Sequence, residues 1–287
     1  MLKLISKEKE HGIFKRISNY RNDFKNWPVV VLKSTLNMFP FDVVLKNGAR
    51  ERIESWRILS KYKLKTRFGA TFEGDYIKFT FMGRNLTLNW ENGSNGDLAA
   101  TFIDQDYRYL DVAGRSVVDI GANIADSAIY FSILGADKVI ALEPFSHTFK
   151  LASENIGLNN INNIELINAG LSDQESTISL DGEMVSNVGS RLTESDNGVP
   201  TELINLESLI EKYRLSDPVL KMDCEGCEYN SILNAANETL SKVRQIMLEY
   251  HNGFKPIKEK LRSAGFKVVH TSNPVRGLLL ATNTSFA

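Results

Sequence analysis

Short apolar segments alternate with helical patterns through the second half of the chain, and no other feature constrains the fold as strongly. Strands that alternate with helices form a parallel sheet that is covered on both faces. The last two apolar segments, 266–269 and 278–281, are joined by only a short polar turn, so they must run antiparallel. We therefore predict a mostly parallel sheet that ends in an antiparallel hairpin. The five earlier segments, each typical of a buried strand, are 117–120, 139–142, 164–167, 219–222 and 246–248.

The first 112 residues follow different patterns. Residues 1–70 hold helical patterns joined by polar turns, and Trp27-Pro28 marks a break because proline cannot continue a helix. Apolar and polar residues alternate over 77–81 and again over 86–90, which predicts a β-hairpin, and the polar stretch 91–97 predicts a loop. We therefore expect a basic, mainly helical region, then a hairpin with a linking helix, then the sheet domain, over residues 1–70, 71–112 and 113–287.

Charge is distributed unevenly along the chain. The net charge of -1 combines 16 Lys/Arg against 6 Asp/Glu in residues 1–70 with 18 against 29 in the remainder. The basic region could associate weakly with anionic surfaces, or it could be solvated or attracted to the acidic remainder. No apolar run approaches the ~20 residues of a membrane span, and the N-terminal residues lack the apolar stretch of a secretory signal. These observations predict a cytoplasmic protein.

The two cysteines are Cys224 and Cys227. Two cysteines are too few for a disulfide framework, and they fit a reducing compartment. Their Cys-x-x-Cys spacing could serve zinc or redox chemistry, but zinc needs four ligands and the chain has no second cysteine pair. We expect both side chains to pack as thiols.

The turn after the first predicted strand has the composition of a cofactor site. Residues 119–126 read Asp-Ile-Gly-Ala-Asn-Ile-Ala-Asp, and Glu143 closes the next strand, where it could bind a ribose diol. A dinucleotide site needs glycine where this chain has Asn123, because the backbone must approach the pyrophosphate. S-adenosylmethionine (SAM) has no phosphate, and its ammonium and sulfonium could meet the carboxylate of Asp119. The turn therefore favours SAM over a nicotinamide cofactor.

Three ordered motifs, at 118–123, 139–144 and 220–228, resemble the FkbM family of SAM-dependent methyltransferases. The resemblance extends over roughly residues 105–280. It implies a class I methyltransferase (Rossmann-like) α/β fold, with a seven-stranded sheet whose last strand is antiparallel. It also implies SAM as cofactor and O-methylation of a sugar, glycan or other small hydroxyl acceptor. Ala125 departs from the family pattern, which usually has glycine at that position.

Further cofactor contacts are expected on either side of these motifs. Asn168 follows the third strand, and its amide offers both a donor and an acceptor to the adenine edge. Arg108 precedes the first strand, where its guanidinium could bind the methionine carboxylate. A turn-forming asparagine and a surface arginine are the simpler interpretations. The full set of predicted cofactor-binding residues is Asp119, Gly121, Ala122, Asn123, Glu143, Asn168 and Arg108.

Acidic residues gather where the fourth strand ends. Asp223, Glu225 and Glu228 could supply a general base, recognise a hydroxyl or hold a divalent cation, although a helix dipole alone could explain the two glutamates. His251 follows the fifth strand and could remove a proton from a hydroxyl, or it could be a hydrogen-bonded structural histidine. We predict a catalytic group of Asp223, Glu225 and His251, with a metal possible but not favoured.

Two alternative functions remain at this point: a nicotinamide-dependent oxidoreductase and a non-catalytic binding protein on the same fold. Residues 185–191 could shape the acceptor site, or they could be a plain surface loop. A nucleic-acid acceptor is not favoured, because the chain has neither an Asn/Asp-Pro-Pro-aromatic motif nor a Pro-Cys nucleophile. The predicted partner is a small molecule or a glycan.

Overall fold

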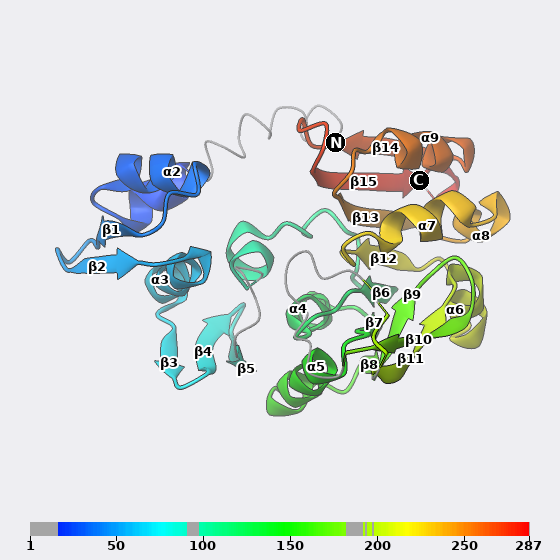
Figure 1. The fold of residues 1–287 in the computed structure, drawn as a ribbon, viewed down its shortest axis with the longest axis horizontal. Helices are drawn as coiled ribbons and strands as arrows, with labels where there is room; N and C mark the ends of the chain where they lie inside the picture. The colour runs from blue at the N-terminus through cyan, green and yellow to red at the C-terminus, as the bar shows by residue number, and fades with distance from the viewer. Residues whose placement is uncertain (1–16, 91–97, 182–191, 193, 197, 287) are drawn as a thin grey trace.

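The computed structural model describes residues 17–90, 98–181, 192, 194–196 and 198–286 (Figure 1). The predicted loop at 91–97 and the segment 185–191 lie outside these described residues. Among the helices of the described part, none combines the length and the apolar character that crossing a bilayer requires.

A seven-stranded sheet occupies the centre of the second half of the chain. The strand order is β14-β15-β13-β12-β6-β7-β8, and all neighbours are parallel except β15, which runs antiparallel to both β13 and β14. The mostly parallel sheet with an antiparallel last strand is thus confirmed. Its strands are β6 (Ser116–Ile120), β7 (Lys138–Leu142), β8 (Ile164–Ile167), β12 (Val219–Met222), β13 (Gln245–Tyr250), β14 (Phe266–His270) and β15 (Gly277–Asn283).

Helices cover both faces of this sheet (Figure 1). Alternate strand residues serve the two faces, so that Val117 packs with one set of helices and Val118 with the other. The first face is covered by α4 (Asp126–Ile133) and α5 (Ser146–Leu158). The second is covered by α6 (Leu206–Lys212), α7 (Cys227–Asn234), α8 (Asn237–Ser241) and α9 (Lys255–Ser263). A short 3-10 helix, η2 (Thr284–Phe286), follows the last strand.

A second, smaller sheet was not predicted. It lies between β8 and α6 in the sequence, with β11 pairing parallel to β9 and antiparallel to β10. Its strands are β9 (Ala169–Leu171), β10 (Ser176–Leu180) and β11 (Val199–Ile204).

The N-terminal region combines helices with a hairpin. The predicted break at Pro28 is confirmed, because residues 17–23 are helical and a new helix then begins with this proline in its first turn. The expectation of a mainly helical region is wrong over 41–53, where two strands pair. These strands bury only alternate residues against a small core of their own, which includes Phe24 and Val30. The elements are α2 (Trp27–Thr35), β1 (Phe41–Val44), β2 (Arg50–Ile53) and α3 (Trp56–Phe68).

The predicted hairpin forms and belongs to a three-stranded sheet. Its strands are β3 (Thr71–Glu73), β4 (Tyr76–Phe81) and β5 (Arg84–Asn89), and the π-helix η1 (Ala99–Asp104) follows where a linking helix was expected. The buried amide of Asn155 on α5 ties this hairpin to the sheet domain. It accepts from the Asn89 backbone N–H at 2.6 Å and donates to the carbonyls of Asn89 at 3.1 Å and Ile124 at 2.9 Å. Through Asn155, the hairpin is therefore hydrogen-bonded to the same side chain as the turn that follows β6.

Candidate active site

A cavity lies at the carboxyl ends of the central strands, where ligands bind in open parallel sheets. It holds about 1020 Å³ of empty space, part of which is open to solvent. The ends of four neighbouring strands reach it. They contribute Gly121 and Asn123 after β6, Glu143 after β7, Asp223 after β12 and Glu249 near the end of β13.

Gly121 holds two strand ends in contact. Its φ is +73°, and a Cβ placed on it would lie 2.0 Å from the backbone oxygen of Asp223, so only glycine fits here. The backbone N–H groups of Gly121 and Ala122 both donate to the Leu142 carbonyl, at 3.0 and 2.9 Å. Ala122 itself is fully buried and does not line the cavity, so it acts through its backbone.

The departure at Ala125 has a conformational basis. Ala125 adopts φ +65°, a left-handed conformation in which glycine is less strained than alanine. The residue is fully buried and immediately precedes α4. Alanine is therefore accommodated at this position with some backbone strain.

Glu143 is buried at the rim of the cofactor turn. Its Oε2 accepts from the Asn123 backbone N–H at 2.9 Å, and its Oε1 accepts from the Phe145 N–H at 3.1 Å. Burial raises the pKa of this carboxyl to about 8. Each carboxylate oxygen has a second lone pair, so Glu143 can fix the turn and still accept hydrogen bonds from a ribose diol.

Asp119 lies beneath the cavity rather than in its lining. It is fully buried, and its Oδ2 accepts from the Ser127 hydroxyl at 2.6 Å. Its Oδ1 lies 2.9 Å from Nζ of Lys221, which does line the cavity and also donates to the Gly121 carbonyl at 2.7 Å. Burial alone would lower the pKa of Lys221, but the charges of Asp119 and Asp223 outweigh it and raise that pKa. In this structure Asp119 therefore reaches the cavity through Lys221.

Lys221 was not among the predicted site residues. It occupies the third position of the predicted strand 219–222, whose other residues are apolar. The signal that could have revealed it is the register, because Lys221 on β12 is paired directly with Asp119 on β6. Opposite charges at facing positions of adjacent buried strands predict an ion pair.

Asn168 and Arg108 make local contacts outside the cavity lining. The Asn168 amide donates to the carbonyls of Glu143 and Pro144, at 2.9 and 3.0 Å, and so supports the turn after β7. The Arg108 guanidinium donates to the Asp104 carbonyl at 3.1 Å. Their roles toward adenine and the methionine carboxylate stay predictions.

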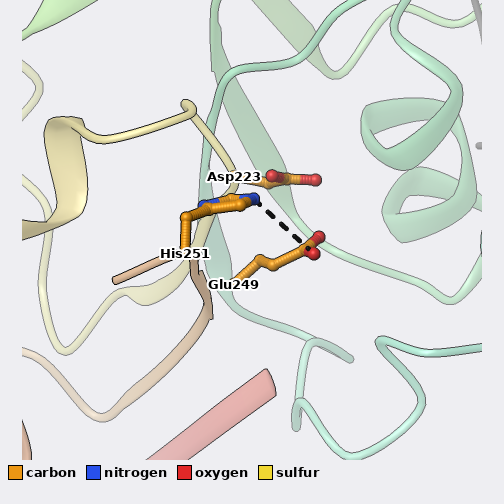
Figure 2. Close-up of side chains that lie close together, drawn as sticks. All are labelled: Asp223, Glu249 and His251. Carbon is orange, nitrogen blue, oxygen red and sulfur yellow. Dashed lines mark ion pairs between the residues drawn. The ribbon is translucent and has the colours of Figure 1, made fainter. Parts of the chain in front are cut away.

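The predicted catalytic residues come together on the other side of the cavity. Asp223 and Glu225 line it, and His251 lies directly beside them, with Nε2 3.2 Å from Oε2 of Glu225. Glu249, which was not predicted, joins this group. Its Oε1 lies 3.6 Å from the same His251 nitrogen (Figure 2). Burial, with the charge of Asp223 adding to it and that of Arg276 opposing it, raises the pKa of Glu249 to about 8. The signal for Glu249 is a carboxylate within an otherwise apolar strand end.

Glu228 has a structural role. Its two carboxylate oxygens accept from the backbone N–H groups of Cys224 and Gly226, both at 2.8 Å, at the start of α7. Burial raises the pKa of this carboxyl to about 7. A carboxylate that caps backbone donors at a helix N-terminus needs no catalytic explanation.

The cysteines form a disulfide, so the expectation that Cys224 and Cys227 pack as thiols is wrong. The backbone between them turns through two residues with positive φ, Glu225 at +55° and Gly226 at +129°. This turn brings the two Cα atoms to 5.5 Å, a separation that a disulfide can span. Both cysteines line the cavity on its acidic side.

Asp126 also lines the cavity and was not predicted as a site residue. It begins α4 and accepts a hydrogen bond from the Thr101 hydroxyl at 2.7 Å, which links the cavity to η1. Burial raises the pKa of this carboxyl to about 6. Asp126 thus adds a further buried acid to the cofactor side.

The sheet order, the Gly121 turn and the cavity at the strand ends have the arrangement of the class I methyltransferase fold. The sequence profile described as "Methyltransferase FkbM domain" matches residues 119–268, and the chain belongs to this family. The family match confirms the resemblance found in the three motifs and supports SAM as the cofactor. No curated protein matches the chain at a significant level.

Several solved methyltransferase structures are similar to this chain at low identity. A precorrin-6y C5,15-methyltransferase from Geobacter metallireducens is 15% identical, with 60% of this chain and 82% of that chain covered and a TM-score of 0.38. A ribosomal protein L11 methylase from Lactobacillus delbrueckii subsp. bulgaricus is 17% identical, with 62% of this chain and 73% of that chain covered and a TM-score of 0.39. TYW2 from M. jannaschii, solved with AdoMet, is 14% identical, with 74% of this chain and 87% of that chain covered and a TM-score of 0.39.

Proposed function

We propose that this chain transfers a methyl group from SAM to an oxygen of a small hydroxyl acceptor, such as a sugar or a glycan. The observation that carries the proposal is the division of the cavity. Gly121, Asn123 and Glu143 follow β6 and β7 in one half of the sheet, and Asp223, Glu225 and Glu249 lie at the ends of β12 and β13 in the other half. The first side suits a neutral diol and a methionine-bearing cofactor, and the second suits a group that must lose a proton.

The residues of the first side fit SAM. The turn at Gly121 brings backbone groups to the cavity surface, and Glu143 lines the cavity after β7, where its carboxylate oxygens can accept hydrogen bonds from a ribose diol. When bound, SAM supplies a sulfonium-activated methyl carbon for in-line displacement. The protein's task is then to orient the acceptor oxygen toward that carbon, since positioning carries much of the rate in such a displacement.

The acidic side would accept the proton of the acceptor. A hydroxyl is a weak nucleophile until its proton is removed, and Asp223 and Glu225 offer carboxylates at the cavity surface. His251 lies 3.2 Å from Glu225 and can pass the proton on. We assign Asp223 as the acceptor-side base, with Glu225 and His251 as its partners.

The proposal is tested with SAM that carries a deuterated methyl group. The full chain is incubated with that SAM and either a cell extract or a panel of sugars, and products are sought by mass spectrometry. A product that gains one labelled methyl on oxygen, and that is lost with Asp223→Asn, supports the proposal. Methylation found only on nitrogen or carbon contradicts the assignment to oxygen.

Membership of the FkbM family argues against a nicotinamide-dependent oxidoreductase. A cytoplasmic location stays a proposal, and the disulfide removes cysteine usage as an argument for it. Weak association of residues 1–70 with anionic surfaces also stays a proposal. Heparin retention that disappears when these residues are removed would support it.

A further inference from the structure

We propose that Asp223, Glu249 and His251 form a binding site for a divalent metal ion at the acceptor side of the cavity. The binding of the ion follows from the geometry of these side chains alone. Its catalytic use rests on the proposed function.

Three side chains from two neighbouring strand ends converge on one point. Asp223 follows β12, Glu249 lies in β13 and His251 follows β13. One ligand atom from each, two carboxylate oxygens and an imidazole nitrogen, lie within 4.8 Å of one another. Figure 2 shows the imidazole ring and both carboxylates directed toward a common space. Donors that are this close can bind one cation at about 2.0–2.5 Å from each, with modest side-chain movement.

His251 supplies an independent observation. Its side chain is only 8% exposed, and among the described residues neither ring nitrogen makes a hydrogen bond. Buried polar groups in folded proteins are nearly always satisfied, so this imidazole requires a partner. Nε2 faces Glu225 and Glu249 at 3.2 and 3.6 Å, and Glu249 is one of the two other ligands. A metal ion in that space would satisfy the ring nitrogen.

The charges around the group also favour a cation. Asp223, Glu225 and Glu249 present three carboxylates to this side of the cavity. Of the basic groups nearby, Lys221 is paired with Asp119 at 2.9 Å. Arg276 is half-exposed and approaches Glu225 and Glu249 only at 3.9 and 3.7 Å. Two positive charges placed among the carboxylates would relieve their mutual repulsion.

The donor set indicates the class of metal. Carboxylate oxygens suit Mg²⁺, Ca²⁺ and Mn²⁺, whereas imidazole favours first-row transition ions. A mixed set of two carboxylates and one imidazole therefore suits Mn²⁺ or a similar ion better than Mg²⁺ or Ca²⁺.

The ion would also narrow the class of acceptor. Three protein ligands leave open coordination positions, which a hydroxyl and a neighbouring oxygen of one molecule could fill together. Such an acceptor is a vicinal diol, as in a sugar. The ion would lower the pKa of the bound hydroxyl. Because Asp223 and His251 are then ligands of the ion, the proton would pass to Glu225, which takes the place of Asp223 as the base. The O–CH₃ bond then forms as the S–CH₃ bond breaks, and the sulfur keeps the bonding pair as a neutral thioether.

Mn²⁺ binding to the full chain tests the site directly. After treatment with EDTA and its removal, the chain is titrated with Mn²⁺, and the unbound ion is measured by EPR. We expect one saturable site per chain and a higher melting temperature with Mn²⁺, because binding stabilises the folded state. Glu249→Gln and His251→Gln should each weaken binding by about tenfold or more, a loss of the order seen when metal sites are disturbed. Glu202→Gln, an exposed carboxylate on β11, should bind as the wild type does.

SAM titration of the same samples separates the possible failures. A folded wild-type chain that binds SAM but shows no saturable Mn²⁺ site overturns the metal proposal and leaves the proposed function standing. Unchanged Mn²⁺ affinity in both ligand variants also overturns it. A chain that binds Mn²⁺ but not SAM supports the metal site and contradicts the proposed function. Should one variant fail to fold, the other variant and the melting-temperature shift of the wild type still decide.

Discussion

The ion pair between Lys221 and Asp119 joins β12 to β6, and its removal should lower the free energy of unfolding substantially. Both side chains are buried, with relative exposures of 3% for Lys221 and 0% for Asp119, and Nζ lies 2.9 Å from Oδ1. Nζ also donates to the Gly121 carbonyl at 2.7 Å, directly at the cofactor turn. Lys221→Met keeps most of the side-chain volume but leaves the fully buried Asp119 carboxylate without its counter-ion.

The expected magnitude follows from that burial. Breaking a buried ion pair by removing one partner typically costs about 3–5 kcal/mol of the free energy of unfolding, because the remaining charge is uncompensated. We expect this range for Lys221→Met and a similar loss for Asp119→Asn. The double variant removes both charges and therefore should cost less than the sum of the two, with a coupling energy of about 2–3 kcal/mol.

Urea unfolding of the wild type, both single variants and the double variant measures this coupling energy. The four curves should share one slope with denaturant, so that their midpoints report stability alone. If the two single losses add to within about 0.5 kcal/mol in the double variant, the residues act independently. The interpretation of Lys221 as the link between the two strands would then be wrong.

Two further predictions concern the cofactor turn. Gly121→Ala should lower the free energy of unfolding by well over the ~1–2 kcal/mol that a left-handed alanine costs, because its Cβ would meet the Asp223 backbone. The control is Gly114→Ala, at φ +66° with no atom near its Cβ, which should lose only that smaller amount. Equal losses of the two variants in urea unfolding would contradict the close contact at Gly121. Glu143, whose pKa is about 8 in the fold against an ordinary 4.5, holds its proton more tightly when folded, so stability should fall as pH rises from about 4.5 to about 8. This fall should be smaller in Glu143→Gln when urea midpoints are compared at about pH 5 and about pH 8. The same pH dependence in wild type and variant would show that Glu143 is not the group whose ionisation destabilises the fold.

The central sheet could be predicted because its strands are continuous apolar runs. Segments such as 219–222 are buried on both faces, and that pattern is visible without knowledge of their neighbours. The pairing of β1 with β2 could not be predicted, because Arg50–Ile53 is mostly charged and only Ile53 is fully buried. Its strand conformation depends on packing against distant residues such as Phe24. Tertiary contacts of this kind override local propensity.

In the candidate site, too, some residues could be predicted from the local sequence and others depend on tertiary contacts. The acidic cluster at Asp223 and the turn at Gly121 follow directly from their positions after apolar strands. Lys221 required the knowledge that β12 lies next to β6, and strand order is a property of the whole sheet. The disulfide could not be predicted, because it depends on a left-handed backbone at Glu225, and a glutamate does not indicate a tight turn.

Isothermal titration of SAM into the wild type, Glu143→Ala and Asp223→Asn tests the central claim most directly. The wild type should bind one SAM per chain. At about pH 9, above the Glu143 pKa of about 8, Glu143→Ala should weaken binding by about 1.5–3 kcal/mol, the range for hydrogen bonds to a charged group. Asp223→Asn should bind SAM nearly as the wild type does while losing turnover, because it acts on the acceptor. A folded wild-type chain without saturable SAM binding, or variants with the reverse pattern, would contradict a methyltransferase site divided in this way.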